Sequence, residues 1–163
     1  MSHQKPGRLK LSRALTSGRE GEHDKVVTGL LVLVGIIHLL PVSGVLGVDR
    51  LWALYGISLG EPNLEILMRH RAVLFGLLGL FLLYAAFQPS LQPLAIIAGL
   101  VNVVAFIAIA WSVGGYNESV RKVVIADIIA IVALIVAGAT YAVSRNHSLH
   151  GHDVFTRMPG YKV

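Results

Sequence analysis

Ionisable and amide side chains stand inside or beside several long apolar runs of this sequence, where each is costly to bury. The candidate site consists of His38, Arg69, His70, Arg71, Asn102 and Asp127. Imidazole, carboxylate and guanidinium groups can exchange protons, pair as ions or hold the polar end of a ligand. Because a carboxylate in apolar surroundings needs a cation, we expect Asp127 to contact Arg71 or Arg69, with His38 nearby.

This polar cluster has a structural and a functional interpretation. In the structural one, the ion pair only holds two helices together. In the functional one, the cluster forms a small polar pocket for a lipid headgroup, a quinone-like molecule or a proton. His38 alone is more typical of a hydrogen-bonded core histidine than of a ligand-binding residue. Arg69, His70 and Arg71 can instead extend to the lipid headgroups, and then the pair with Asp127 does not form.

The segments that carry these residues are long enough to cross a bilayer. The chain has 163 residues, of which 55% are hydrophobic and 14% charged, and its mean hydropathy is +0.69. A soluble domain of this size is less apolar. A helix crosses the hydrocarbon of a bilayer with roughly 20 apolar residues, and four segments meet this length: 26–46, 62–87, 94–113 and 118–143. The sequence therefore predicts an all-α integral membrane protein, a four-helix up-down bundle.

The polar ends of the chain divide it into three parts. We expect a basic tail at 1–25, a transmembrane domain at 26–144 and a polar tail at 145–163. Pro41 should kink the first span near its far end. The segment from Gly47 to His70 mixes aromatic, apolar and charged residues, which is typical of an amphipathic loop at the headgroup level.

Up-down connectivity places most of the candidate site in one half of the membrane. His38 lies late in the first span, Arg71 lies early in the second, and Asp127 lies early in the fourth, so all three belong beneath the 47–70 loop. Asn102 is in the middle of the third span. The remaining aromatic residues are expected to be interface anchors rather than a stacking site; these are Trp52, Tyr55, Trp111 and Tyr116.

A stripe of small residues follows one face of the fourth span. It consists of Ala126, Ala130, Ala133, Ala137, Thr140 and Ser144. Such stripes let membrane helices approach closely, because dispersion packing replaces the hydrophobic effect in lipid. The stripe is expected to face the other spans, and a second copy of the chain is the alternative.

Basic residues indicate the orientation. The N-terminal tail holds Lys5, Arg8, Lys10, Arg13, Arg19 and Lys25, and the C-terminal tail holds Arg145, Arg157 and Lys162. This bias predicts that both termini are cytoplasmic. The N-terminal tail has no interleaved aromatic residues, so anionic lipid is a better partner for it than nucleic acid.

Several kinds of chemistry find no support in the sequence. There is no cysteine, so disulfides and thiolate metal sites are excluded. The histidines of the C-terminal tail, His147, His150 and His152, are interpreted as a passive tail rather than a metal site. The phosphate-binding, nucleophile-elbow and zinc-protease motifs are absent. We therefore expect no catalytic residue, no metal and no cofactor.

The runs IIHLLPVSGVLGVDRLWALYGI, EPNLEILMRHRAVLFGLLG, WSVGGYN and ADIIA carry a resemblance. Over residues 26–143 the chain resembles a group of small uncharacterised four-helix inner-membrane proteins of bacteria. More distantly it is similar to the DoxX-like superfamily, some members of which are small subunits associated with quinone-linked oxidoreductases. The resemblance implies this topology and a multi-pass location in a bacterial inner membrane, and it transfers no functional residue.

The sequence leaves three functions open. The first is a non-enzymatic accessory or interaction subunit, whose partners are membrane lipids, another membrane protein or a second copy joined through the fourth span. The second is a binder or carrier of a small amphipathic molecule, such as a lipid or a quinone-like compound, in an outer-leaflet polar pocket. The third is a quinone-linked redox accessory subunit.

Overall fold

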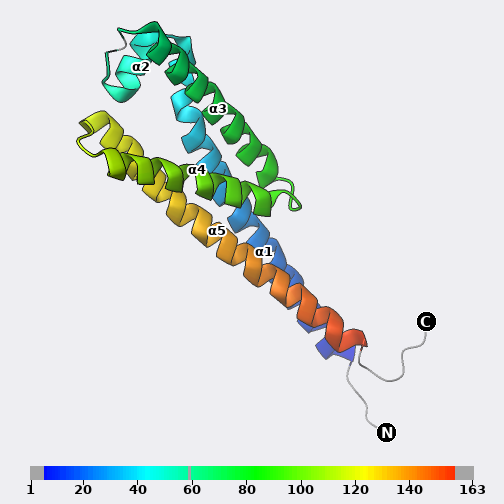
Figure 1. Ribbon diagram of the computed structural model, residues 1–163. Helices are drawn as coiled ribbons and strands as arrows, with labels where there is room; N and C mark the ends of the chain where they lie inside the picture. Colours follow the sequence, from blue (N-terminus) through cyan, green and yellow to red (C-terminus); the bar gives the residue numbers. More distant parts are fainter. Residues whose placement is uncertain (1–5, 59, 157–163) are drawn as a thin grey trace.

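Helices make up all the regular structure in the described part of the chain (Figure 1). The computed structural model describes residues 6–58 and 60–156, and the side chains of 22–58 and 60–146 among them. The elements are α1 (Pro6–Leu39), the 3-10 helix η1 (Leu40–Leu46), α2 (Val48–Tyr55), α3 (Pro62–Ala86), α4 (Gln92–Val113) and α5 (Glu118–Thr156). The predicted all-α fold class is confirmed.

Four of these helices are long and apolar enough to cross a membrane. The candidate spans are Glu22–Leu46, Pro62–Ala86, Gln92–Val113 and Glu118–Asn146. Large apolar side chains such as Leu77, Val101 and Ile135 are more than half exposed on their outward faces. Such surfaces are stable against acyl chains, because apolar side chains need no hydrogen bonds and the backbone of a helix satisfies its own. These features match a multi-pass membrane protein.

The helix bounds differ most from the sequence prediction at three places. The backbone is already helical from Pro6, and α5 continues to Thr156, beyond the predicted end at Val143. At Pro41 the chain does not kink within one α-helix. Because proline has no backbone N–H to donate, the α-helix ends at Leu39 and the tighter 3-10 helix η1 follows.

The predicted loop between the first two spans contains the short helix α2. Gly56 ends this helix with a φ of 61°, a left-handed conformation that glycine adopts without a steric penalty. In Figure 1, α2 lies at one end of the molecule, beside the start of α3. The amphipathic segment is therefore more regular than the sequence indicated.

Helix α1 packs most extensively against α3 and α5, and α4 packs against α5 and α3. Glycines permit a close approach where α1 crosses α3. A Cβ added at Gly35 would lie 3.1 Å from the Gly79 carbonyl oxygen, and one added at Gly79 would lie 3.0 Å from the Gly35 carbonyl oxygen. The two backbones are thus in contact at this crossing, as in other small-residue membrane contacts.

The small-residue stripe of α5 faces the bundle. Ala130, Ala133 and Ala137 are all buried within the single chain, in a core that also contains Leu31 of α1 and Ile96 of α4. Self-association through this helix is not tested by the structure of one chain and stays a prediction.

One backbone oxygen joins three helices at the end of the bundle remote from α2. The Ala86 carbonyl, in the last turn of α3, accepts a hydrogen bond from the Thr28 hydroxyl of α1 at 2.9 Å. It also accepts one from the buried Gln92 side-chain amide of α4 at 3.2 Å. The free carbonyl of a helix end is therefore satisfied by side chains of its two neighbours.

Candidate ligand-binding site

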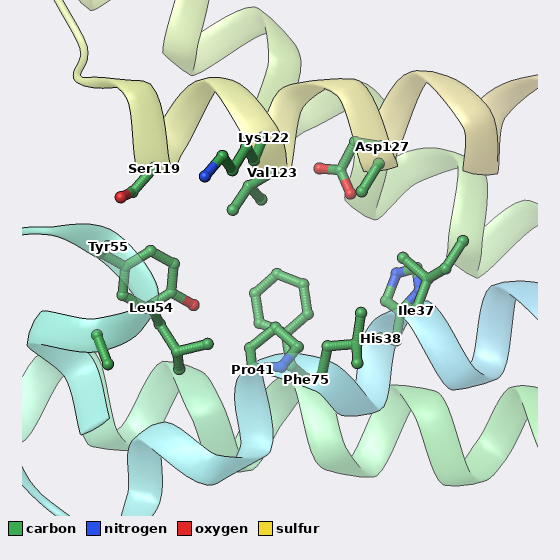
Figure 2. Close-up of a pocket in the computed structure, with 13 residues that line it drawn as sticks. Ile37, His38, Pro41, Leu54, Tyr55, Phe75, Ser119, Lys122, Val123 and Asp127 are labelled. Carbon is green, nitrogen blue, oxygen red and sulfur yellow. The ribbon is translucent and has the colours of Figure 1, made fainter.

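A cavity of about 250 Å³ lies between α1, α2, α3 and α5 (Figure 2). Its polar wall is formed by His38, Tyr55, Ser119, Lys122 and Asp127. Its apolar wall is formed by Ile37, Leu40, Pro41, Ala53, Leu54, Phe75, Val123 and Ala126. The bordering residues Leu40, Ala53 and Lys122 are exposed, so the cavity opens at the surface. A mostly apolar lining with a few convergent polar groups is typical of small-molecule sites.

Asp127 is the least satisfied polar residue of this cavity. The residue is only 4% exposed, and its Oδ2 atom is buried without a hydrogen-bond partner. In Figure 2 the carboxylate points from α5 into the space opposite His38. An unpaired buried acceptor is costly, and a ligand that supplies a donor would remove that cost.

The predicted ion pair between Asp127 and an arginine is wrong. Within residues 22–58 and 60–146 the ion pairs are Arg69 with Glu65, at 3.2 Å, and Arg121 with Glu118, at 2.7 Å. Arg69 is exposed and also donates to the Val45 carbonyl at 3.0 Å. The backbone carbonyl and the Glu65 carboxylate accept hydrogen bonds from the Arg69 guanidinium near the surface. Keeping the charge there costs less free energy than burying it beside Asp127.

Arg71 is held by aromatic rings in place of a carboxylate. Its guanidinium carbon lies 5.3 Å from the ring centroid of Tyr55, 5.1 Å from that of Phe75 and 5.1 Å from that of Phe106. These rings come from α2, α3 and α4, and their faces attract the cation. The Nη2 atom of Arg71 is buried and has no hydrogen-bond partner. The charge is therefore stabilised by ring quadrupoles next to the cavity.

His38 and Asn102 form the second polar contact of the site. The His38 Nδ1 atom lies 2.9 Å from the Val34 carbonyl oxygen, and its Nε2 atom lies 3.2 Å from the Asn102 Nδ2 atom. A carbonyl only accepts, so Nδ1 carries the proton and Nε2 accepts from the amide. The His38 ring is also in contact with Phe75, at 5.8 Å between centroids. Phe75 thus lies between the histidine and the arginine.

Tyr55 does not have the interface-anchor position that the sequence predicted. Its side chain is buried, and Figure 2 shows its hydroxyl directed into the cavity. Burial raises the pKa of this phenol above its ordinary value, an effect that nearby Arg71 opposes and Asp127 reinforces. Tyr55 is therefore a neutral hydrogen-bond donor on the cavity wall. Trp52, Trp111 and Tyr116 are exposed, and their position at a membrane interface stays a prediction.

Asn117 holds Tyr55 in place. Its amide donates to the Tyr55 carbonyl at 2.7 Å and to the Gly56 carbonyl at 3.4 Å. Its Oδ1 atom accepts from the Val120 backbone N–H at 2.9 Å, which is the N-cap contact of α5. One side chain therefore caps α5 and fastens the end of α2 over the cavity.

The structure brings together part of the predicted cluster. His38 and Asp127 line the cavity, whereas Arg71 and Asn102 contact residues that line it. His70 and Arg69 are exposed and do not contribute. Phe75, Phe106 and Asn117 were not among the site residues predicted from the sequence, and Tyr55 was predicted to be an interface anchor. The i,i+4 spacing of Arg71 and Phe75 is the local signal that could have indicated the first of these contacts. The tail histidines at 147, 150 and 152 have side chains outside the described residues.

Comparisons with protein-family models, with curated proteins and with solved structures find no match to this chain.

Proposed function

We propose that this chain is a membrane protein that binds a small amphipathic molecule in the cavity between α1, α2, α3 and α5. The observation that carries the proposal is the buried, unpartnered Asp127 Oδ2 atom on the wall of a cavity of about 250 Å³. A packing lock would pair this oxygen with a donor, because a buried acceptor without one is costly. The open cavity has polar and apolar walls and lies beside an unsatisfied acceptor. A ligand that fills the cavity and donates a hydrogen bond to this acceptor explains both features better.

The proposed location follows from the charge pattern and the resemblance. We place the chain in the plasma membrane of a bacterium with both termini in the cytoplasm. The cavity then opens in the outer leaflet. Roles as an accessory subunit or as a quinone-linked redox subunit, and membership of the DoxX-like superfamily, stay predictions.

Binding is tested by native mass spectrometry of the full-length chain, extracted from bacterial membranes in mild detergent. Ala126 lines the cavity, so Ala126→Phe should fill it. The matched control is Ala108→Phe, at an exposed position of α4 outside the cavity. We expect one small molecule on the wild-type chain and on the Ala108→Phe variant, and none on Ala126→Phe. Equal occupancy of both variants, or no bound molecule on any of the three proteins, would contradict the proposal.

A further inference from the structure

The cavity has polar groups at both ends and an apolar middle. Figure 2 shows Ser119 and Lys122 toward one end, and Asp127 and His38 toward the other. Phe75, Pro41 and Val123 lie between the two ends. Asp127 follows Ser119 by eight residues of one helix, which is about 12 Å along the helix axis. A ligand with a single polar group would satisfy only one end.

The two ends require different chemistry. At the deep end, Asp127 Oδ2 lacks a donor, while the His38 ring nitrogens already have partners. At the outer end, Lys122 takes part in no ion pair within residues 22–58 and 60–146, and Figure 2 shows its ammonium directed toward Ser119. The deep end therefore needs a hydrogen-bond donor, and the outer end suits an anion.

Cationic amphiphiles fit this site poorly. The aromatic faces of Tyr55 and Phe75, which would attract an ammonium group, already contact the Arg71 guanidinium. Two positive charges, Lys122 on the cavity wall and Arg71 beside it, also outnumber the single carboxylate of Asp127. A cationic group would therefore be repelled by Lys122 at the outer end, and by the Arg71 guanidinium where it approaches the aromatic rings.

We propose that the occupant is a linear molecule with an apolar middle, a carboxylate-like anionic group at one end and a hydroxyl donor at the other. The anionic end contacts Lys122 and Ser119 at the mouth, the hydrocarbon packs on Phe75 and Val123, and the hydroxyl donates to Asp127. This assignment rests on the proposed function and specifies the class of ligand.

The test compares probes that share one chain length. These are ω-hydroxydecanoate, decanoate, which lacks the hydroxyl, and decanediol, which lacks the anion. Their affinities are measured by equilibrium dialysis against the full-length chain, stripped of copurified molecules and reconstituted in nanodiscs, with protein-free nanodiscs used to subtract partitioning into lipid. We expect ω-hydroxydecanoate to bind about tenfold more tightly than either of the others, the effect of one hydrogen bond to a charged group.

Two variants should each abolish one of these differences in affinity between probes. Asp127→Leu should make ω-hydroxydecanoate and decanoate equal, and Lys122→Gln should make ω-hydroxydecanoate and decanediol equal. Glu118→Leu, which removes an exposed carboxylate of the same helix, should leave both differences intact. The comparison of probes on the wild-type chain needs no variant to fold.

The outcomes separate this inference from the proposed function. Equal binding of decanoate and ω-hydroxydecanoate by the wild-type chain would overturn the inference. So would failure of all three probes to bind. If a molecule is nevertheless found on the wild-type chain and lost in Ala126→Phe, the proposed function stands and its ligand belongs to another chemical class. If all three probes fail to bind and no molecule is found on the wild-type chain, both the inference and the proposed function are overturned.

Discussion

The Nε2 atom of His38 accepts a hydrogen bond from the Asn102 side-chain amide, joining α1 to α4 across 64 positions of the sequence. His38 is 1% exposed, so this contact is made without competition from solvent. It explains how an imidazole is held inside an apolar bundle: each ring nitrogen has one partner, the Val34 carbonyl for Nδ1 and the Asn102 amide for Nε2.

Replacing Asn102 by leucine should destabilise the protein by about 1–3 kcal/mol, because the Nε2 acceptor of His38 is left buried without a donor. The double variant His38→Leu with Asn102→Leu should lose less than the sum of the two single variants, since it removes both partners. Thermal unfolding in detergent measures all three. Additive effects would show that the two side chains do not interact.

Replacing Asp127 by leucine should stabilise the delipidated protein by at least about 1 kcal/mol, because the variant no longer buries an unsatisfied carboxylate oxygen. For a chain of this length that corresponds to a rise in Tm of about 2–4 °C. Glu118→Leu is the matched control and should change stability by less than about 1 kcal/mol, as expected for an exposed ion pair. A drop in Tm for Asp127→Leu would contradict this expectation and show that the carboxylate stabilises the bundle.

Gly35→Ala should destabilise the contact between α1 and α3 by about 1–3 kcal/mol, the usual cost of overpacking. Its new methyl group would meet the Leu83 side chain at 2.9 Å and the Gly79 carbonyl oxygen at 3.1 Å. Gly29→Ala is the control on the same helix, because a Cβ there has no neighbour within 4 Å. The thermal unfolding midpoint of Gly35→Ala should be lower than that of Gly29→Ala. Equal midpoints would show that the packing of α1 on α3 does not depend on this close approach.

Substitutions of Asn117 should separate its two contacts. Asn117→Asp keeps an oxygen to cap the Val120 N–H but loses the amide that donates to the Tyr55 carbonyl. Asn117→Ala loses both contacts and should cost about 1–2 kcal/mol through the cap. Hydrogen exchange of the α2 amides should become faster in both variants. Exchange of the first turn of α5 should become faster only in Asn117→Ala. Unchanged α2 exchange in Asn117→Asp would mean that this side chain does not fasten α2.

The architecture was predictable because hydrocarbon imposes a strong pattern on a sequence. Runs of about 20 apolar residues leave few alternatives to a membrane-spanning helix, and Pro62 begins α3 as its sequence position indicated. The stripe of alanines in α5 also indicated the face that packs inside the bundle. The 3-10 helix after Leu39 was missed, since the effect of Pro41 depends on how the chain continues into α2.

The site was predictable only in part, because side-chain partners depend on the relative rotation of the helices. The cost of burying charge correctly drew attention to His38 and Asp127, which line one cavity. The same reasoning paired Asp127 with an arginine, but the rings of Tyr55, Phe75 and Phe106 surround Arg71 instead. Aromatic residues on apolar helices resemble lipid-facing residues in sequence, so their common contact with one cation was not apparent.

The Ala86 carbonyl accepts hydrogen bonds from both Thr28 and Gln92, and this affects where a molecule can enter the cavity. Because this oxygen ties α1, α3 and α4 together at the end far from α2, the helices cannot separate there without breaking two hydrogen bonds. The cavity opens at the surface beside Leu40, Ala53 and Lys122, so a molecule enters at the α2 end while the remote end stays closed. The rate of entry should therefore depend on the α2 contacts and hardly at all on the lipid composition around the opposite end.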